Sequence, residues 1–319
     1  MITHNQLSAG AQTLQTAHAV ADWIVANPGE CERWKQESNS IIALATKTEE
    51  DLYKLLDKLK VDSKYMVFRE PDFGNAITAI AVTPADINKK MLANLPLAGK
   101  ITDVEQEKLK VEGERKKRKA SFDMLNTDQT EGQNILEHGE SVYKHYLQLK
   151  DHLEGKINLG KEPSWVIPEW LNENSYHILR NLPSDYVMER YLMLHDCGKP
   201  SVAVMVDGRN SFPGHAAASV AKFRSTFAYG AESESDELIS YFIEHDMDVH
   251  LLKADGVDEF TLSEHFTTQL IVALAEITAN AGMFGGVNSV GFKIKYKTLI
   301  QRAKKAFRKL DNMLLEECV

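Results

Sequence analysis

Hydrophobic residues follow two different patterns along the chain, and the change falls near residue 100. In the first 95 residues, helical periodicity alternates with short apolar runs of strand length. Apolar runs of strand length occupy residues 41–46, 65–69 and 77–82, and amphipathic helical segments occupy residues 10–27 and 48–59. The predicted order is α-β-α-β-β, which is a small α/β layer.

Beyond residue 100 the pattern is helical almost throughout. A highly charged helix is predicted over residues 102–119. Further helices are predicted over residues 133–150, 186–195, 212–229, 235–246, 260–281 and 292–315, and no strand signal of comparable strength interrupts them. The sequence therefore predicts an α+β protein with an α/β domain at residues 1–95, a charged helical connector at 96–124 and an all-α domain at 125–319.

Composition places the chain among globular proteins. It has 319 residues, of which 43% are hydrophobic and 26% charged. No apolar run approaches the ~20 residues that a membrane span requires, and residues 1–6 lack the basic and apolar pattern of a secretory signal. Cys31, Cys197 and Cys318 are far apart and have no metal-ligand spacing. We expect a cytoplasmic protein without a membrane partner.

The charge distribution leaves nucleic-acid binding open. A net charge of −9 argues against a protein coated in nucleic acid. Two segments are nevertheless basic, namely residues 115–119 and residues 292–309, and the second contains no acidic residue. An apolar stripe from Phe292 to Leu310 requires the basic residues of that last helix to face outward. These segments are either phosphate-binding patches or solvated helix faces.

Four histidines stand in contexts that favour metal binding. A single histidine in a helix is usually a structural residue. His138, His195, His215 and His245, however, each lie beside small, acidic or glycine residues. Imidazole is a common ligand of transition metals, so the four together indicate a shared site.

The adjacent pair His195-Asp196 restricts where a shared metal ion can lie. Neighbouring residues of a helix point about 100° apart, so both side chains can bind one ion only near a helix end. Gly198 and Pro200 are expected to supply that end. Imidazole and carboxylate together suit Zn, Mn, Fe, Ni or Co better than Mg alone, and a bound ion makes water acidic enough to attack phosphorus. Lys199, about one helical turn away, is a candidate to stabilise phosphate charge.

Residues from about 125 to 285 resemble the HD superfamily of metal-dependent phosphohydrolases. The likeness is carried by Leu194–Pro200, Phe212–Ser219 and Glu244–Asp246, and it is strongest to the HD domain attached to some bacterial tRNA nucleotidyltransferases. The order and spacing of these motifs agree over more than a hundred residues. The resemblance implies a helical bundle around one or two divalent transition-metal ions, with Mg as an alternative.

The resemblance also implies a ligand set. His138 would be the first ligand, His195 and Asp196 the signature pair, and His215 and His245 would complete one metal or bind a second. In a two-metal site Asp196 would bridge both ions and act in catalysis together with Lys199.

The chain departs from the family at the last ligand. The family usually closes its site with a later Asp, whereas the corresponding segment here offers Glu276, Thr278 and Asn280. Asp246, Asp248 and His250 are candidates to compensate, and we interpret them as solvated residues at helix ends.

The first domain resembles the type II peptidyl-tRNA hydrolase fold over about residues 5 to 90. The likeness is carried by residues 7–19 and by residues 69–72 leading into 78–84. Where that family has a Gly-Lys pair, this chain has Gly10-Ala11, and Glu70-Pro71-Asp72 replaces the usual Asp-Ala-Gly followed by Thr. Loss of an ammonium that holds the substrate should remove several kcal/mol of transition-state stabilisation.

We therefore expect the first domain not to hydrolyse peptidyl-tRNA. Gln15, His18 and Arg69 remain candidate contacts to an RNA end, and the alternative is that Gln15 and His18 only pack or satisfy the backbone.

Three functions follow from these expectations. The first is a phosphohydrolase that acts on RNA or tRNA ends, for example on a 2′,3′-cyclic phosphate. The second is a phosphohydrolase of free nucleotides, for which the acidic net charge is no handicap. The third is a tRNA-binding or regulatory module with a structural metal. The sequence leaves the oligomeric state open.

Overall fold

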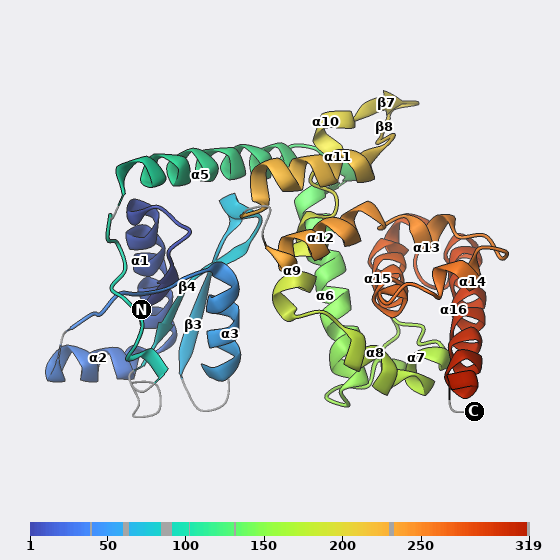
Figure 1. The fold of residues 1–319 in the computed structure, drawn as a ribbon, viewed down its shortest axis with the longest axis horizontal. Helices are drawn as coiled ribbons and strands as arrows, with labels where there is room; N and C mark the ends of the chain where they lie inside the picture. The colour runs from blue at the N-terminus through green and yellow to red at the C-terminus, as the bar shows by residue number, and fades with distance from the viewer. Residues whose placement is uncertain are drawn as a thin grey trace. The chain divides into compact units, whose positions relative to one another are not determined.

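The computed structural model describes residues 1–38, 40–59, 64–83, 91–101, 103–130, 132–229 and 233–317, with side chains up to residue 313. The chain forms two compact units, Met1–Asp123 and Met124–Val319. Pro84, which ends a segment of the peptidyl-tRNA hydrolase likeness, and Thr102, the expected start of the charged helix, lie outside the described residues. The fold class α+β is confirmed (Figure 1).

Unit 1 is built on a four-stranded mixed sheet with the strand order β2-β1-β4-β3. β1 pairs with β2 in parallel and with β4 in antiparallel orientation, and β3 and β4 form an antiparallel pair with a register shift between Phe68 and Arg69. Its elements are β1 (Ile2–His4), α1 (Ala9–Ala26), α2 (Pro28–Glu37), β2 (Leu44–Thr46), α3 (Glu49–Leu59), β3 (Tyr65–Glu70), the 3-10 turn η1 (Pro71–Phe73), β4 (Ala76–Val82) and most of α5 (Val104–Leu125).

Both faces of this sheet are covered by helices. Six consecutive residues of β4 are buried, which requires packing on both sides of the strand. α1 begins after Ser8, whose hydroxyl accepts from the N–H of Ala11, and α1 and α3 both pack against β4. The apolar run at residues 41–46 forms a strand only from Leu44 onward, because Ile41 and Ile42 lie exposed before it.

Unit 2 is mostly helical. Its longer helices are α6 (Ile135–Leu153), α9 (Asp185–Leu194), α11 (His215–Lys222), α12 (Glu234–Glu244), α15 (Phe266–Ala279) and α16 (Val290–Glu317). The shorter elements are η2 (Leu159–Lys161), α7 (Glu169–Glu173), α8 (Ser175–Asn181), α10 (Lys199–Val202), the π-helical turn η3 (Phe223–Phe227), α13 (Asp248–Leu251), α14 (Val257–Phe260) and η4 (Asn280–Phe284).

The expectation of an all-α second part was wrong in one respect, because two short hairpins interrupt it. β5 (Asp128–Thr130) pairs with β6 (Gln133–Asn134), and β7 (Val204–Val206) pairs with β8 (Arg209–Ser211). The second hairpin turns at Asp207 and Gly208, both with positive φ. Strands of two or three residues that bury little side chain leave almost no periodic signal in a sequence.

α15 is the central helix of unit 2. Every residue from Phe266 to Ala275 is buried, so this helix is enclosed on all sides. It packs against α6, and α9 packs against both α6 and α12 (Figure 1). α16 buries the apolar stripe that starts at Phe292, and its lysines face outward or lie half-buried, as the pattern predicted. None of the described helices combines the length and apolar character needed to cross a bilayer.

Candidate metal centre

The start of α6 places His138 in the interior. Asn134 caps this helix, because its side chain accepts from the N–H of Glu137 while the Glu137 carboxylate accepts from the N–H of Asn134. His138 follows in the first turn and is 1% exposed. The next residue, Gly139, allows α6 to approach the end of α9 closely, since a Cβ there would lie 2.8 Å from the Met193 carbonyl oxygen.

His195 and Asp196 lie at the end of α9, but this helix ends earlier than expected. Its last residue is Leu194, His195 is the C-terminal cap, and Gly198 and Pro200 belong to the start of α10. Gly198 makes a second close approach, because a Cβ on it would lie 2.2 Å from the backbone nitrogen of Ser219 in α11. His195 and Asp196 are therefore held in a short turn between two helices, and both are buried.

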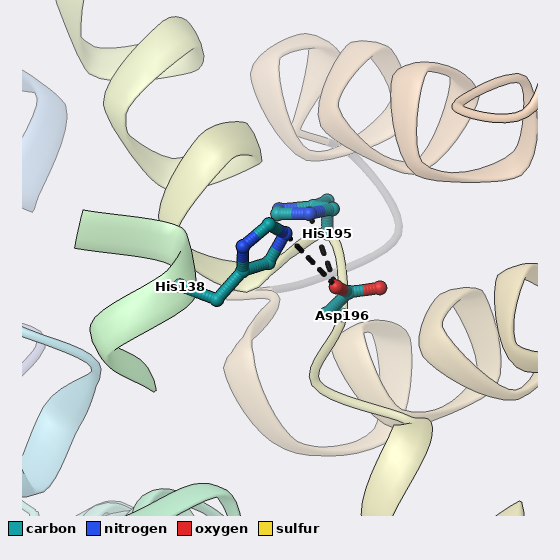
Figure 2. A group of neighbouring side chains, drawn as sticks. All are labelled: His138, His195 and Asp196. Carbon is teal, nitrogen blue, oxygen red and sulfur yellow. Dashed lines mark ion pairs between the residues drawn. The ribbon is translucent and has the colours of Figure 1, made fainter. Parts of the chain in front are cut away.

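His138, His195 and Asp196 point toward one another (Figure 2). Nε2 of His195 lies 3.2 Å from Oδ2 of Asp196, and Nε2 of His138 lies 3.6 Å from the same oxygen. Both ring nitrogens of His138 and Oδ1 of Asp196 are buried without a hydrogen-bond partner. Unpartnered buried polar atoms cost free energy, and Nε2 of His138 faces the Asp196 carboxylate, so the arrangement fits a group built to hold a cation.

Hydrogen bonds set the orientation of two of the imidazoles. Nδ1 of His195 lies 2.8 Å from the Leu192 carbonyl oxygen, and Nδ1 of His215 lies 3.1 Å from that of Phe212. A ring nitrogen that donates to a carbonyl leaves Nε2 as the free ligand atom. Nε2 of His215 lies 3.8 Å from Oδ1 of Asp196, so His215 reaches the edge of the cluster.

Two further carboxylates complete the centre. His195, Asp246 and Glu276 form a second group whose ligand atoms all lie within 4.8 Å of one another. Oε1 of Glu276 lies 4.0 Å from Nε2 of His138, and Oε2 of Glu276 lies 2.8 Å from Nε2 of His250. The prediction that Asp246 and His250 are solvated was wrong. Asp246 accepts a 2.7 Å hydrogen bond from the Tyr191 hydroxyl, and His250 contacts Glu276.

The structure does not bring His245 into either group. Its Nδ1 lies 2.7 Å from Oδ2 of Asp248, and its ring contacts Tyr241 with centroids 4.3 Å apart. Asp248 is exposed, as expected. His245 and Asp246 follow the last turn of α12, where neighbouring side chains diverge, and Asp246 is the one that faces the cluster.

Burial and neighbouring charges shift the pKa values of groups in the centre in opposite directions. Burial lowers the pKa of His138 to about 4, so its imidazole is neutral. Burial would also lower the pKa of His195, but the Asp196 and Asp246 carboxylates outweigh it and raise the value to about 10. Burial would raise the pKa of Glu276, but His250 outweighs it and brings the value to about 2.

Lys199 is directed at Asp196. Its Nζ donates to Oδ2 of Asp196 at 2.6 Å and to Oε1 of Gln129 at 3.0 Å, and it lies 5.2 Å from the centre of the Phe212 ring. The neighbouring thiol of Cys197 is turned away, because it donates to the Ser219 carbonyl oxygen at 3.5 Å. Burial raises the pKa of this thiol, so the donor set consists of nitrogen and oxygen atoms only.

The residues proposed to contact RNA differ in exposure. Gln15 is fully buried, donates to Glu70 and accepts from the Thr78 hydroxyl at 3.0 Å. A side chain so enclosed offers no surface to RNA, which matches the packing alternative. His18 is exposed and stacks on Phe68 with ring centroids 4.7 Å apart, and Arg69 donates to the Asn75 carbonyl oxygen.

The basic run at residues 115–119 is largely paired within its own unit. Lys116 lies 3.4 Å from Glu112, Arg118 lies 3.9 Å from Asp72 and Lys119 lies 3.1 Å from Asp123. Lys117 is buried and has a partner of its own. Acidic neighbours therefore reduce the positive charge of this run, and Arg115 remains exposed.

The basic face of α16 is only partly paired. Arg302 donates to the carbonyl oxygens of Val249 and His250, and Lys304 lies 2.8 Å from Glu169. Lys293, Lys295 and Lys297 are exposed. These three lysines are the better candidates for contacts to an anionic partner.

Comparisons of the chain with protein-family models, with curated proteins and with solved structures find no match. The likeness to HD phosphohydrolases and to type II peptidyl-tRNA hydrolases therefore rests on the sequence motifs alone.

Proposed function

We propose that the protein is a metal-dependent phosphohydrolase with its active site at this centre. One observation carries the proposal. Two imidazoles and three carboxylates, contributed by α6, by the end of α9, by the segment after α12 and by α15, converge in the interior of unit 2. Lys199 and His250 each contact one of these carboxylates, while Nε2 of His138 and Oδ1 of Asp196 remain buried without a hydrogen-bond partner, which supports a cation as the missing partner.

The donor set supports a transition metal. Nitrogen and carboxylate oxygen ligands without a thiolate suit Mn, Fe, Co, Ni or Zn, and Mg is the alternative. Such an ion, when bound, would acidify water and polarise a phosphoryl oxygen. His138, His195, Asp196, Asp246 and Glu276 are the residues that would hold it.

The chain's own polar groups have distinct roles in this proposal. Asp196 would orient the attacking water through Oδ1, an oxygen that is buried without a hydrogen-bond partner. The Lys199 ammonium would meet negative charge that develops on the phosphate next to Asp196. His250 and Tyr191 each bond one carboxylate of the centre and thereby fix its orientation.

For the substrate we propose a phosphate ester at an RNA or tRNA end, such as a 2′,3′-cyclic phosphate, with a free nucleotide as the alternative. The two family resemblances and the exposed lysines of α16 support RNA. If RNA is bound through these lysines, affinity for tRNA should fall steeply with added salt. Weak binding that salt does not change would favour the free nucleotide.

Metal analysis of the purified protein, followed by hydrolysis of bis-p-nitrophenyl phosphate with Mn, Ni, Co or Mg, tests the activity. His138→Ala and Asp196→Asn should each lower the rate at least about 100-fold. His152→Ala is the matched control, because His152 lies on the same helix about 21 Å from His138 at 1.5 Å per residue. Equal rates for wild type and Asp196→Asn would contradict the assigned site.

A tRNA-binding or regulatory module with a structural metal predicts another result. Such a protein would bind the ion and would release no phosphate with any of the four metals.

A further inference from the structure

The two groups of candidate ligands have one residue in common. His138, His195 and Asp196 make up one group, and His195, Asp246 and Glu276 make up the other. Nδ1 of His195 contacts the Leu192 carbonyl oxygen, so only Nε2 of this ring is available to either group. A nitrogen lone pair binds one ion, and the two groups are therefore two halves of one coordination sphere around Nε2 of His195.

A second ion would find too few ligands beside the first. The free face of Asp196 is Oδ1, and the nearest imidazole nitrogen there is Nε2 of His215 at 3.8 Å. Among the described residues, these two side chains belong to no further group of three metal-ligating residues. Divalent ions in protein sites usually have three or more protein ligands when they are held without substrate.

Lys199 already supplies a positive charge to the Asp196 carboxylate, at Oδ2, the oxygen that faces His138 and His195. Its Nζ lies 2.6 Å from Oδ2 of Asp196, and its side chain is held by Gln129 and by the Phe212 ring. Lys199 is only 7% exposed, so water screens its charge weakly. This ammonium would repel any ion bound to Asp196, and a second ion at Oδ1 would be repelled by the first ion as well.

We propose that the centre binds one divalent ion and that the Lys199 ammonium supplies the positive charge that a second ion supplies in two-metal phosphohydrolases. This inference rests on the proposed function. A phosphoryl group bound here would meet both the metal and the lysine beside Oδ2 of Asp196, because Lys199, His138 and His195 all face that oxygen. Removal of Lys199 then has two opposite effects, since the ion gains affinity while phosphate stabilisation is lost.

The test uses Mn²⁺ as the probe. Full-length protein is stripped with a chelator, equilibrated with Mn²⁺, and its bound metal is counted by mass spectrometry and by electron paramagnetic resonance. We expect one Mn²⁺ per chain without the spin coupling of a metal pair. Two coupled ions would overturn the one-ion inference and leave the hydrolase proposal intact, whereas no bound ion would overturn the proposed function itself.

Lys199→Met tests the role of the ammonium, with Lys144→Met, an exposed lysine of α6, as control. Lys199→Met should bind Mn²⁺ about tenfold more tightly or better, because a repelling charge is removed. Its turnover of bis-p-nitrophenyl phosphate should fall at least about tenfold. Weaker Mn²⁺ binding would assign Lys199 a merely structural role and would overturn the inference, and the count in wild type decides the number of ions even if this variant does not fold.

Discussion

Replacement of Gly198 by alanine should destabilise unit 2 strongly, although it adds only one methyl group. Gly198 has an ordinary φ of −88°, so backbone strain plays no part. The added Cβ would lie 2.2 Å from the Ser219 nitrogen and 2.3 Å from the Ala218 carbonyl carbon. Ordinary contacts begin at 3.4 Å, so α10 and α11 would have to separate by roughly 1 Å.

The expected loss follows from this geometry. Overpacking of a dense interior typically costs about 1–3 kcal/mol, and backbone atoms cannot rotate away as a side chain can. The shift would also weaken the 3.0 Å hydrogen bond from the Gly198 N–H to the Ser219 hydroxyl, which contributes about 1 kcal/mol. We expect Gly198→Ala to lower the free energy of unfolding of unit 2 by about 3 kcal/mol or more.

Urea unfolding can be monitored through hydrogen exchange of the α15 amides. This signal reports on unit 2 specifically, because α15 is its enclosed central helix. Gly282→Ala is the matched control in the same unit, since a Cβ there meets nothing within 4 Å. It should change stability by less than about 0.5 kcal/mol. A Gly198→Ala protein as stable as the control would refute the close approach of α10 and α11.

Three further predictions concern the centre and unit 1. In the presence of chelator, the free energy of unfolding should fall as pH rises from 6.5 toward about 10. The pKa of His195 is raised in the folded state, so its contribution to stability is complete below the unfolded-state pKa and is lost as pH rises through the folded-state pKa. Urea unfolding across this range should show the decline in wild type and not in His195→Gln. His250→Leu should weaken Mn²⁺ binding about 10- to 100-fold in titration calorimetry, because Glu276 loses its 2.8 Å hydrogen-bond partner. His250→Gln should restore part of the affinity, and equal affinities for wild type and His250→Leu would contradict this role. The protein should release no peptide from peptidyl-tRNA, because Gly10-Ala11 offers no ammonium; release that persists in His195→Ala would place that activity in unit 1.

Strong local patterns in the sequence were enough to predict most long helices and three of the four strands in the sheet of unit 1. The helix predicted over 133–150 is observed as Ile135–Leu153, and the helix predicted over 186–195 as Asp185–Leu194. β1 and α2 were not predicted. β1 has only three residues, and it is a strand because it pairs with both β2 and β4, which are distant in sequence.

The candidate site was predictable in part. The adjacency of His195 and Asp196 and the glycine after them indicated a helix end, and the structure places both in a turn that begins at a helix end. Glu276 is the only charged residue in the helix Phe266–Ala279, and this pattern indicates a site residue. A charge in a helix enclosed on all sides needs a partner in the interior.

The choice between His245 and Asp246 could not be made from sequence. Both residues follow the last turn of α12, and a rotation of about 100° decides which side chain enters the interior. In the structure the side chain of Asp246 accepts a hydrogen bond from the Tyr191 hydroxyl, which comes from α9. Sequence spacing within one segment contains no information about such a contact.

The central claim is that one cation joins His138, His195 and Asp196. An anomalous difference map from crystals equilibrated with Mn²⁺ tests it most directly. The account predicts a peak within about 2.0–2.3 Å of the His195 and His138 imidazoles and of an Asp196 oxygen, with Glu276 or Asp246 beside it. The absence of a peak at these side chains, with Mn²⁺ bound elsewhere or not at all, would contradict it.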